Sequence, residues 1–470
     1  MALNTELRPV LHFSPAKGWI NDPNGLIRLD GRYHLFFQHN PVDIIHGPMH
    51  WGHASSPDLI EWTEHPIALF PDQNGECFSG SAVMVTATSA TPVLSDGQVL
   101  LFYTSHRPVP SGGGLQAQCM AVSDRRFSRI EPVTSNPVLP NQGLADFRDP
   151  KVIWHEESRR WVMVTTHGQS IGIYSSSDAF EWRFESEFGA DEGTHGEGPW
   201  ECPDLFPISG EDGQRAWILI VGIGSGHPSG GSGTQYFIGD FDGRLFRNRN
   251  TRNTTLWLDW GRDHYATQSF AGLEDEAPLV LAWMNNWDYA QVTPARTFRG
   301  VMSLPRRLSL TGQGVERRLR QSIASEVATR FPRLPMTGDA IASPKTGVYS
   351  VSEVWRPERG NFELALFSGE FRLSFVADEN DSHHVRVRRS EAGVERGRAP
   401  FASDFVVPLP KGPVPINIFV DNGLVECSLA DGDVWISMIC FPADPADPIV
   451  AKGASVVADR DRGAAARARS

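Results

Sequence analysis

The sequence predicts an all-β protein in which a five-bladed β-propeller is followed by a C-terminal β-sandwich. Two observations predict this architecture. A short pattern recurs five times within the first 283 residues, and segments of alternating apolar and polar residues fill the region 337–457. Antiparallel sheets repeated around a central channel form propellers, and alternating segments are typical of strands that bury one face. A single large β-sandwich with chance similarity among its strands is the alternative interpretation.

The recurring pattern is a polar turn followed by a compact run of β-branched and aromatic residues, which is typical of a strand. The five copies are 30–37, 96–103, 157–164, 212–220 and 274–283. Their aligned apolar positions are separated by 66, 62, 55 and 63 residues, and they are Tyr33, Val99, Trp161, Ala216 and Leu279. A second element, which begins with Ser or Gly and ends with an aromatic residue, lies between the copies at 55–62, 123–127, 176–182 and 239–246.

The character of the chain changes after residue 308. Residues 1–311 are predicted to form the propeller and to carry the catalytic site. The charged segment within 312–336 is expected to be a linker with a short helix, and 337–457 a separate β-sandwich. The Ala/Arg-rich residues 458–470 are expected to form a disordered tail.

Composition excludes several classes of protein. With 43 Lys and Arg against 56 Asp and Glu, the formal net charge is −13, so nucleic acid is an unexpected partner. The sequence contains no apolar run of the roughly 18–20 residues that cross a bilayer, and we expect no membrane partner. The five cysteines are an odd number and contain no CxxC pair, which is typical of reduced thiols. The N-terminus lacks a signal-peptide pattern: we expect a cytoplasmic protein if Met1 is the native start, and a secreted one if a leader precedes it.

Three acids precede copies of the pattern by similar distances. Asp22, Asp149 and Glu201 lie 11, 12 and 15 residues before the aligned positions of the first, third and fourth copies. Equivalent positions on the innermost strands of a propeller face one axis, so three carboxylates spread over 180 residues are expected to converge in one pocket. A Pro follows each acid within two residues, and taken singly each motif would be interpreted as a turn.

A pocket with paired carboxylates suits the cleavage of a glycosidic bond. The oxocarbenium-like transition state needs an anion beneath the anomeric carbon and a proton donor for the departing oxygen. The two acids therefore need different environments. Glu201 lies between Trp200 and Cys202, an apolar setting that should raise its pKa, whereas Asp22 precedes an open turn whose amide donors should favour the anion.

The segments around these acids resemble glycoside hydrolase family 32, the β-fructosidases. The resemblance covers nearly the whole chain through 19–25, 35–41, 50–54, 78–81, 147–151, 200–204, 285–289 and 302–305. It implies a five-bladed propeller with a C-terminal sandwich, Asp22 as nucleophile, Glu201 as acid/base and Asp149 as the residue that stabilises the transition state. The substrate-binding residues that we expect from these motifs are Asn21, Gln38, Trp51, Phe78, Ser79, Arg148 and Trp287.

One position departs from the family pattern. Members of this branch commonly carry a Trp shortly after the motif at 38–41, just before a Gly, and here His46 precedes Gly47. The change removes an apolar wall and adds a group that titrates near neutrality. We expect His46 at the edge of the substrate pocket, where it would affect the preferred leaving group.

A metal site is the rival interpretation of the histidines in this region. His34, His39, His46, His50 and His53 fall within 20 residues, but their spacing matches no strong zinc pattern and no cysteine lies among them. Packing and hydrogen bonds to sugar explain them better. We expect no metal, and the family resemblance implies no organic cofactor.

These observations predict a retaining β-fructofuranosidase that hydrolyses sucrose, fructo-oligosaccharides or fructans by double displacement. Retention implies that the carboxyl groups of Asp22 and Glu201 lie about 5–5.5 Å apart. Two alternatives remain open: a fructosyltransferase with the same residues, and a non-catalytic carbohydrate-binding propeller. The oligomeric state is left open.

Overall fold

The protein is described by a computed structural model in which residues 8–109, 113–273, 276–337, 340–378, 382–397 and 399–453 are defined. Almost all regular structure within these residues is β. The exceptions in the described ranges are one turn of α-helix, α1 (Ser325–Ala328), and five 3-10 turns. The 3-10 turns are Ala290–Val292, Gly314–Glu316, Pro357–Arg359, Phe367–Gly369 and Ala430–Gly432. Among the described residues, no helix is long and apolar enough to cross a membrane.

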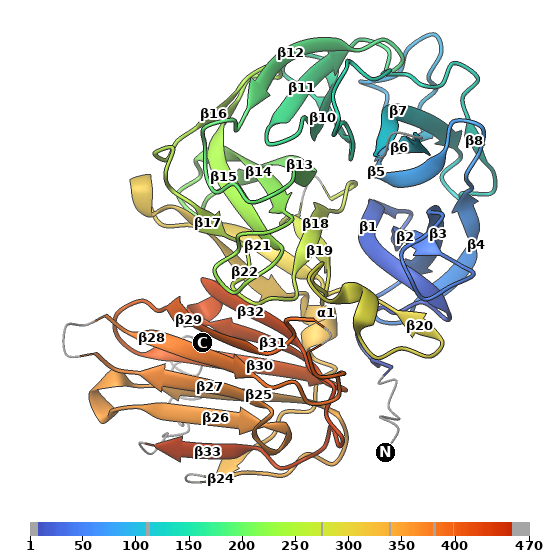
Figure 1. Ribbon diagram of the computed structural model, residues 1–470. Helices are drawn as coiled ribbons and strands as arrows, with labels where there is room; N and C mark the ends of the chain where they lie inside the picture. Colours follow the sequence, from blue (N-terminus) through green and yellow to red (C-terminus); the bar gives the residue numbers. More distant parts are fainter. Residues whose placement is uncertain are drawn as a thin grey trace, which may run out of the picture. The chain divides into compact units, whose positions relative to one another are not determined.

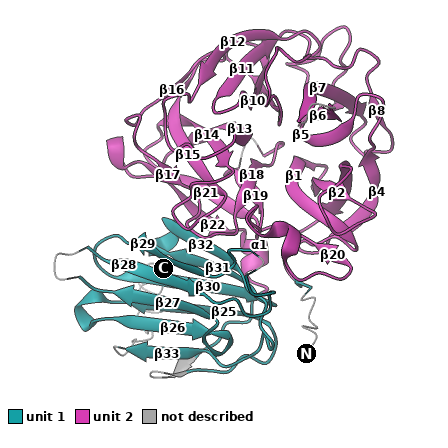
Figure 2. Ribbon diagram, in the orientation of Figure 1, with its two compact units in different colours: residues 1–10, 331–470 teal, residues 11–330 magenta. Residues whose placement is uncertain are grey.

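The chain divides into two compact units (Figure 2): residues 11–330, and residues 1–10 together with 331–470. In the described residues, the first unit contains five sheets, antiparallel except for one short parallel strand. They form a ring in Figure 1, with β1, β5, β13 and β18 toward its middle and β4, β8, β12 and β16 toward its rim. This arrangement is the predicted five-bladed propeller.

The blades follow one another along the chain. Blade I contains β1 (Gly18–Leu29), β2 (Arg32–Asn40), β3 (His50–Ser56), β4 (Thr63–Leu69) and, parallel to β1, β20 (Phe298–Arg299). Blade II contains β5 (Glu76–Met84), β6 (Val99–Pro108), β7 (Gly114–Ser123) and β8 (Ile130–Pro132). Blade III contains β9 (Lys151–His155), β10 (Arg160–Thr166), β11 (Ile171–Ser176) and β12 (Arg183–Phe188). Blade IV contains β13 (Trp200–Ser209), β14 (Arg215–Ile223), β15 (Gly233–Phe241), β16 (Phe246–Asn248) and β17 (Leu256–Trp257). Blade V contains β18 (Tyr265–Ser269), β19 (Leu279–Trp283), β21 (Arg306–Thr311) and β22 (Arg318–Ile323).

The polar turns of the repeated pattern join the first two strands of a blade. In blade I, Leu29 pairs with Arg32, and the two residues between them, Asp30 and Gly31, have φ angles of 49° and 79°. Two consecutive residues with positive φ form the hairpin turn that matches the twist of antiparallel strands, and Asp-Gly is a favoured pair there. The repeat therefore marks a hairpin.

The second repeated element is a side-chain-stabilised turn between the third and fourth strands. In blade I, Asp58 accepts hydrogen bonds from Ser56 Oγ and from two following backbone amides, and the Trp62 indole donates to the Leu59 carbonyl at 3.1 Å. The same contacts recur in blade III at Ser176, Asp178, Ala179 and Trp182. Equivalent turns in different blades explain why the sequence repeats.

The apolar faces of neighbouring sheets pack against each other. One cluster of buried residues between blades II and III contains Phe102, Trp161 and Tyr174. A second cluster between blades III and IV contains Val164, Trp200 and Leu219. The core therefore lies between blades, which leaves the innermost strands free to present polar side chains to the axis.

The segment 312–336, expected to be a linker with a short helix, contains the single-turn helix α1 (Ser325–Ala328) and also a strand that was not predicted. Residues 318–323 form the outer strand of blade V, in which exposed and buried positions alternate. The charged residues of this segment suggested a helix, but the alternation has the two-residue period of a strand. The boundary between the two units lies between Arg330 and Phe331, within the expected linker.

The second unit contains a seven-stranded and a four-stranded sheet. The seven-stranded order is β23 (Met336–Thr337), β24 (Ala340–Ile341), β33 (Val450–Gly453), β26 (Phe362–Leu366), β27 (Phe371–Val376), β28 (His384–Arg389) and β29 (Ser403–Pro408). The four-stranded order is β25 (Val348–Trp355), β30 (Val414–Asp421), β31 (Leu424–Leu429) and β32 (Val434–Ile439). Side chains of β27 and β28 alternate between buried and more exposed positions, as the sequence pattern predicted. The tail expected at 458–470 lies outside the described residues.

Candidate active site

The three acids lie on or beside the innermost strands of three blades. Asp22 is part of β1, Asp149 precedes β9 by two residues, and Glu201 is the second residue of β13. The pairing register shifts in β1 after Ile20 and in β13 after Glu201. Such bulges re-aim side chains at the end of a strand, and here they occur where the acids face the interior.

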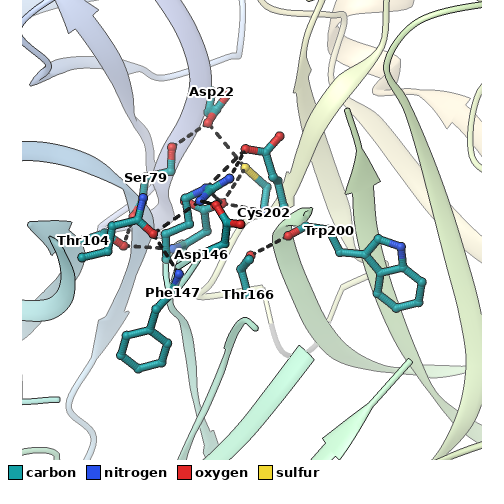
Figure 3. A network of polar contacts seen from close by, with 12 residues as sticks. Asp22, Ser79, Thr104, Asp146, Phe147, Thr166, Trp200 and Cys202 are labelled. Carbon is teal, nitrogen blue, oxygen red and sulfur yellow. Dashed lines mark hydrogen bonds and ion pairs between the residues drawn. The ribbon is translucent and has the colours of Figure 1, made fainter. Parts of the chain in front are cut away.

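Asp22 is almost fully buried. Its Oδ2 accepts a hydrogen bond of 2.6 Å from Ser79 Oγ and a longer one of 3.4 Å from the Cys202 thiol, and Figure 3 shows these two side chains converging on it. Among the described residues, its Oδ1 has no hydrogen-bond partner. The described side chains around Asp22 therefore leave this buried oxygen without a donor.

The expected electrostatics of Asp22 need correction. The sequence suggested that amide donors from the following turn would favour the anion. Instead, burial raises the pKa of Asp22, and the hydrogen bonds from Ser79 and Asn21 offset this only in part. The free-energy cost of removing the carboxylate from water exceeds the stabilisation that these donors provide. This cost arises from burial by residues of other blades, which are far away in the sequence.

Asp149 occupies a strained backbone position beside Asp22. Its φ is 62°, a left-handed conformation that non-glycine residues rarely adopt. Its backbone amide donates to Thr104 Oγ1 at 2.9 Å, and its Oδ2 accepts from the backbone amide of Cys202 at 2.9 Å. Burial raises the pKa of Asp149 to about 7, with a further increase from the nearby charges of Glu201 and Asp22, while Arg148 acts in the opposite direction.

Glu201 has polar neighbours from other blades. Its Oε1 accepts from the Arg148 guanidinium at 2.9 and 3.3 Å, and its Oε2 accepts from the Tyr265 hydroxyl at 2.6 Å. The expectation of an apolar setting was wrong because Arg148 and Tyr265, which come from other blades, supply polar contacts to this carboxyl group. The indole of Trp200 points away from the acids in Figure 3, and it stacks on His195 with ring centroids 4.8 Å apart.

Tyr265 was missed in the sequence. It begins β18, 14 residues before the aligned position in the fifth copy of the repeated pattern. It therefore has the same phase as the three acids, and that spacing could have identified it.

The Arg148 guanidinium contacts several acids of the site at once. In addition to Glu201, its guanidinium donates to Asp146 at 2.6 Å and to Gln116 at 3.3 Å, and it lies 3.9 Å from Asp149. One guanidinium therefore meets three carboxylates, with Asp22 as a fourth acid nearby. The pocket can hold protons, because this many acids with one cation cannot all ionise at low cost.

The remaining predicted substrate-binding residues form a buried polar and aromatic group, described first, and an aromatic group around His46. Asn21 and Gln38 are buried on β1 and β2, where Asn21 accepts from the Trp19 indole at 2.8 Å and Gln38 donates to the Cys77 carbonyl at 3.0 Å. Trp51 is fully buried and packs into the apolar cluster between blades I and II, and its indole donates to the Phe78 carbonyl at 2.9 Å. Trp51 thus supports the strand that carries Ser79.

Aromatic rings gather around His46. Its ring centroid lies 5.7 Å from that of Trp287, 6.1 Å from Trp19 and 6.3 Å from Phe78, each in an edge-on arrangement. Phe78 in turn stacks on His106 at 4.2 Å. Burial lowers the pKa of His46, so the imidazole is neutral at neutral pH and contributes to this aromatic cluster.

The five clustered histidines serve different purposes. His34 and His53 form a hydrogen bond of 3.1 Å with each other, and burial lowers their pKa to about 4 and about 2. His39 contacts the Trp19 carbonyl at 2.8 Å, and His50 contacts the Pro48 carbonyl at 2.9 Å. Within the described part of the chain, no group of three or more His, Cys, Asp or Glu side chains could hold a metal ion.

Three clustered carboxylates and an arginine beside the inner strands of a β-propeller suit the cleavage of a glycosidic bond, the reaction of glycoside hydrolases. The profile of the glycosyl hydrolases family 32 N-terminal domain matches residues 12–322, nearly the whole propeller unit. The chain belongs to glycoside hydrolase family 32, as its sequence motifs predicted.

Relatives with known names extend this match beyond the propeller. The chain is 38% identical over 457 residues to a levanase of Bacillus subtilis, covering 93% of this chain and 67% of that protein. It is 34% identical to the extracellular exo-inulinase of Aspergillus niger, covering 93% and 89% of the two chains.

Solved structures agree in fold. The exo-inulinase of Aspergillus awamori superposes with a TM-score of 0.84 and 30% identity, covering 97% of both chains. The β-fructofuranosidase of Schwanniomyces occidentalis, solved with fructosyl-erythritol, has a TM-score of 0.78 and 28% identity over 96% of both chains. These matches confirm the predicted combination of propeller and sandwich.

Proposed function

We propose that this chain is a retaining β-fructofuranosidase that releases terminal β-D-fructofuranosyl units from sucrose, fructo-oligosaccharides or fructans. Its relatives are named levanase, exo-inulinase and invertase, enzymes of one substrate class. A structural neighbour binds a fructosyl ligand. The observation that carries the proposal is the position of Cys202, the residue after Glu201, whose thiol contacts Asp22 and whose amide contacts Asp149. Cys202 therefore links the acids, and the charge of Glu201 acts on both Asp22 and Asp149.

In the first step, Asp22 attacks C2 of the fructosyl unit through Oδ1, while Glu201 protonates the departing oxygen. Ser79 supports the attack because its hydroxyl holds the other oxygen of Asp22 and so fixes the rotamer of the nucleophile. The bond between C2 and the leaving oxygen breaks as the bond between C2 and Asp22 forms.

In the second step, Glu201 takes a proton from water, and the resulting hydroxide attacks C2 and releases Asp22. Arg148 and Tyr265 each donate to a different oxygen of Glu201, so the same carboxyl group can act as acid and then as base without reorientation. Asp149 binds hydroxyl groups of the fructosyl ring. With its pKa raised to about 7, it can hold a proton and donate a hydrogen bond below neutral pH.

The test is a panel of sucrose, inulin and levan with the wild-type chain, read out as released sugar. Hydrolysis predicts equal amounts of free glucose and fructose from sucrose, and NMR of the first product should show the β anomer. Glucose in excess over free fructose, with longer oligosaccharides, would indicate the fructosyltransferase alternative. No released sugar from any substrate would leave the carbohydrate-binding propeller as the better description.

We further propose that the protein acts outside the cell. Two supports are the polymeric substrates in this class and the relatives named extracellular exo-inulinase. The native host grown on inulin should then carry most of the fructose-releasing activity in its medium. Activity confined to the cell pellet would contradict secretion.

A further inference from the structure

A buried ion pair lies just beyond two of the acids along the chain. Lys151 follows Asp149 by two residues at the start of β9, and Asp204 follows Glu201 by three residues on β13. The Lys151 Nζ lies 3.0 Å from Asp204 Oδ1, and the side chains are 7% and 0% exposed. The proposed reaction uses neither group.

A third inner strand takes part in this contact. Lys151 Nζ also donates to the carbonyl and the hydroxyl of Ser269, both at 3.0 Å, and the Ser269 amide donates to Asp204 Oδ2. These contacts join β9, β13 and β18, the innermost strands of blades III, IV and V. The two hydrogen bonds to Ser269 and the charge of Asp204, 3.0 Å away, hold the ammonium in position.

Two residues close to this ion pair along the chain have strained backbones: Asp149 itself, and Cys202, which follows Glu201. Asp149 has a φ of 62° and Cys202 a φ of 49°. Backbone strain at a functional site persists only when the surrounding structure fixes it from several sides. On the pocket side, Thr104 accepts from the Asp149 amide, and Gln268 donates to the Cys202 carbonyl at 2.9 Å.

The ion pair supplies the fixed point on the other side of each strained residue. From Asp149 the chain passes through only Pro150 to reach Lys151, and from Glu201 it passes through Cys202 and Pro203 to reach Asp204. Proline restricts the backbone at both connections. A change in the separation of Lys151 and Asp204 would therefore move Asp149 relative to Glu201.

A buried ion pair is a poor source of stability, because the cost of removing two charges from water can exceed their attraction. Well-packed apolar side chains would join the blades equally well. Apolar side chains could not supply the hydrogen bonds through which Ser269 holds both charged groups.

We propose that Lys151 and Asp204 are positioning residues for fructoside cleavage, which fix blades III and IV at the separation that lets Asp149 and Glu201 act on one fructosyl unit. This inference rests on the proposed function. It assigns no contact with substrate to either residue.

The propeller offers a matched control. Arg306 and Asp259 form a second fully buried ion pair, with a distance of 2.9 Å and exposures of 0% and 1%. They join blade V to the segment that precedes it. Neither residue contacts the three acids.

The experiment compares two double variants, K151M/D204L and R306M/D259L, in kcat and KM on sucrose and in melting temperature. Each replaces one buried ion pair by apolar side chains. We expect kcat of K151M/D204L to fall about 30- to 100-fold with KM changed less than about threefold, since a misplacement of about 1 Å can cost about 100-fold in rate. The R306M/D259L variant should keep both constants within about threefold of wild type, whatever its melting temperature.

A folded K151M/D204L variant with kcat within about threefold of wild type would overturn the proposal. Equal losses of kcat in both double variants would also overturn it, because they would indicate a general effect of destabilisation. If K151M/D204L does not fold, the milder D204N variant decides in the same way. A wild-type chain that releases no fructose from any substrate refutes the proposed function, and the positioning role falls with it. An active wild type with an unaffected double variant refutes the positioning role alone.

Discussion

The carboxyl group of Asp149 should make the propeller less stable as pH rises toward neutrality. The substitution D149N should remove this pH dependence. Burial raises the pKa of Asp149 from its ordinary value of 3.8 to about 7. Between these values the folded chain binds a proton that the unfolded chain releases, so stability falls as pH rises through this window. The destabilisation is absent below the unfolded pKa and complete above about pH 7.

The magnitude follows from the two pKa values. A rise from 3.8 to about 7 corresponds to about 4 kcal/mol of lost stability above neutrality. Asn has nearly the same shape, and its side-chain oxygen can still accept from the Cys202 amide. We therefore expect D149N to have almost no effect on stability near pH 4 and to stabilise the fold by about 4 kcal/mol near pH 8.

Differential scanning calorimetry of both proteins at the two pH values measures this difference. A change of about 4 kcal/mol should raise the melting temperature of a unit of this size by roughly 5–10 °C. A D149N effect that is the same at both pH values, or is larger in acid, would refute the reasoning. Loss of activity in D149N is expected in either case and does not bear on this test.

Three further predictions concern the reaction. D22N should lower kcat by at least about 1,000-fold while isothermal calorimetry still detects fructose binding, and activity within tenfold of wild type would rule out Asp22 as the nucleophile. S79A removes the hydroxyl that holds Asp22 and should lower kcat about tenfold, the value of one charge-assisted hydrogen bond, whereas an unchanged kcat on sucrose would exclude this support. Y265F should lower kcat/KM about tenfold for the same reason, and equal kcat/KM for the variant and wild type would show that Tyr265 does not hold Glu201 in the reacting state.

The convergence of the acids could be predicted because a propeller repeats its geometry. Asp22, Asp149 and Glu201 lie at similar distances before aligned strands, and this phase survives even where the repeat is degenerate. The same reasoning applied to the fifth copy would have found Tyr265. The spacing of a residue before the aligned strand therefore predicted its place in the site better than its residue type did.

The electrostatic environment of each acid could not be predicted from its sequence neighbours. The Trp200 indole points away from the acids, and the contacts of Glu201 are supplied by Arg148 and Tyr265 from other blades. The raised pKa of Asp22 has the same origin, since burial reflects the packing of all the inner strands.

The outer strand of blade V was missed for a different reason. Residues 318–323 carry enough charge to suggest a solvated helix. Their exposed and buried positions nevertheless alternate in the structure, and the apolar residues at 319 and 323 were visible in the sequence. The two-residue period should have outweighed composition.

Because the acids are distributed over blades I, III and IV, the catalytic site exists only when all the blades have folded into the propeller. A nascent or partly unfolded chain that lacks any one of these sheets has no assembled centre, however well its other sheets are formed. Turnover therefore reports the integrity of a 320-residue unit, and hydrolysis cannot begin until the last sheet has joined the first.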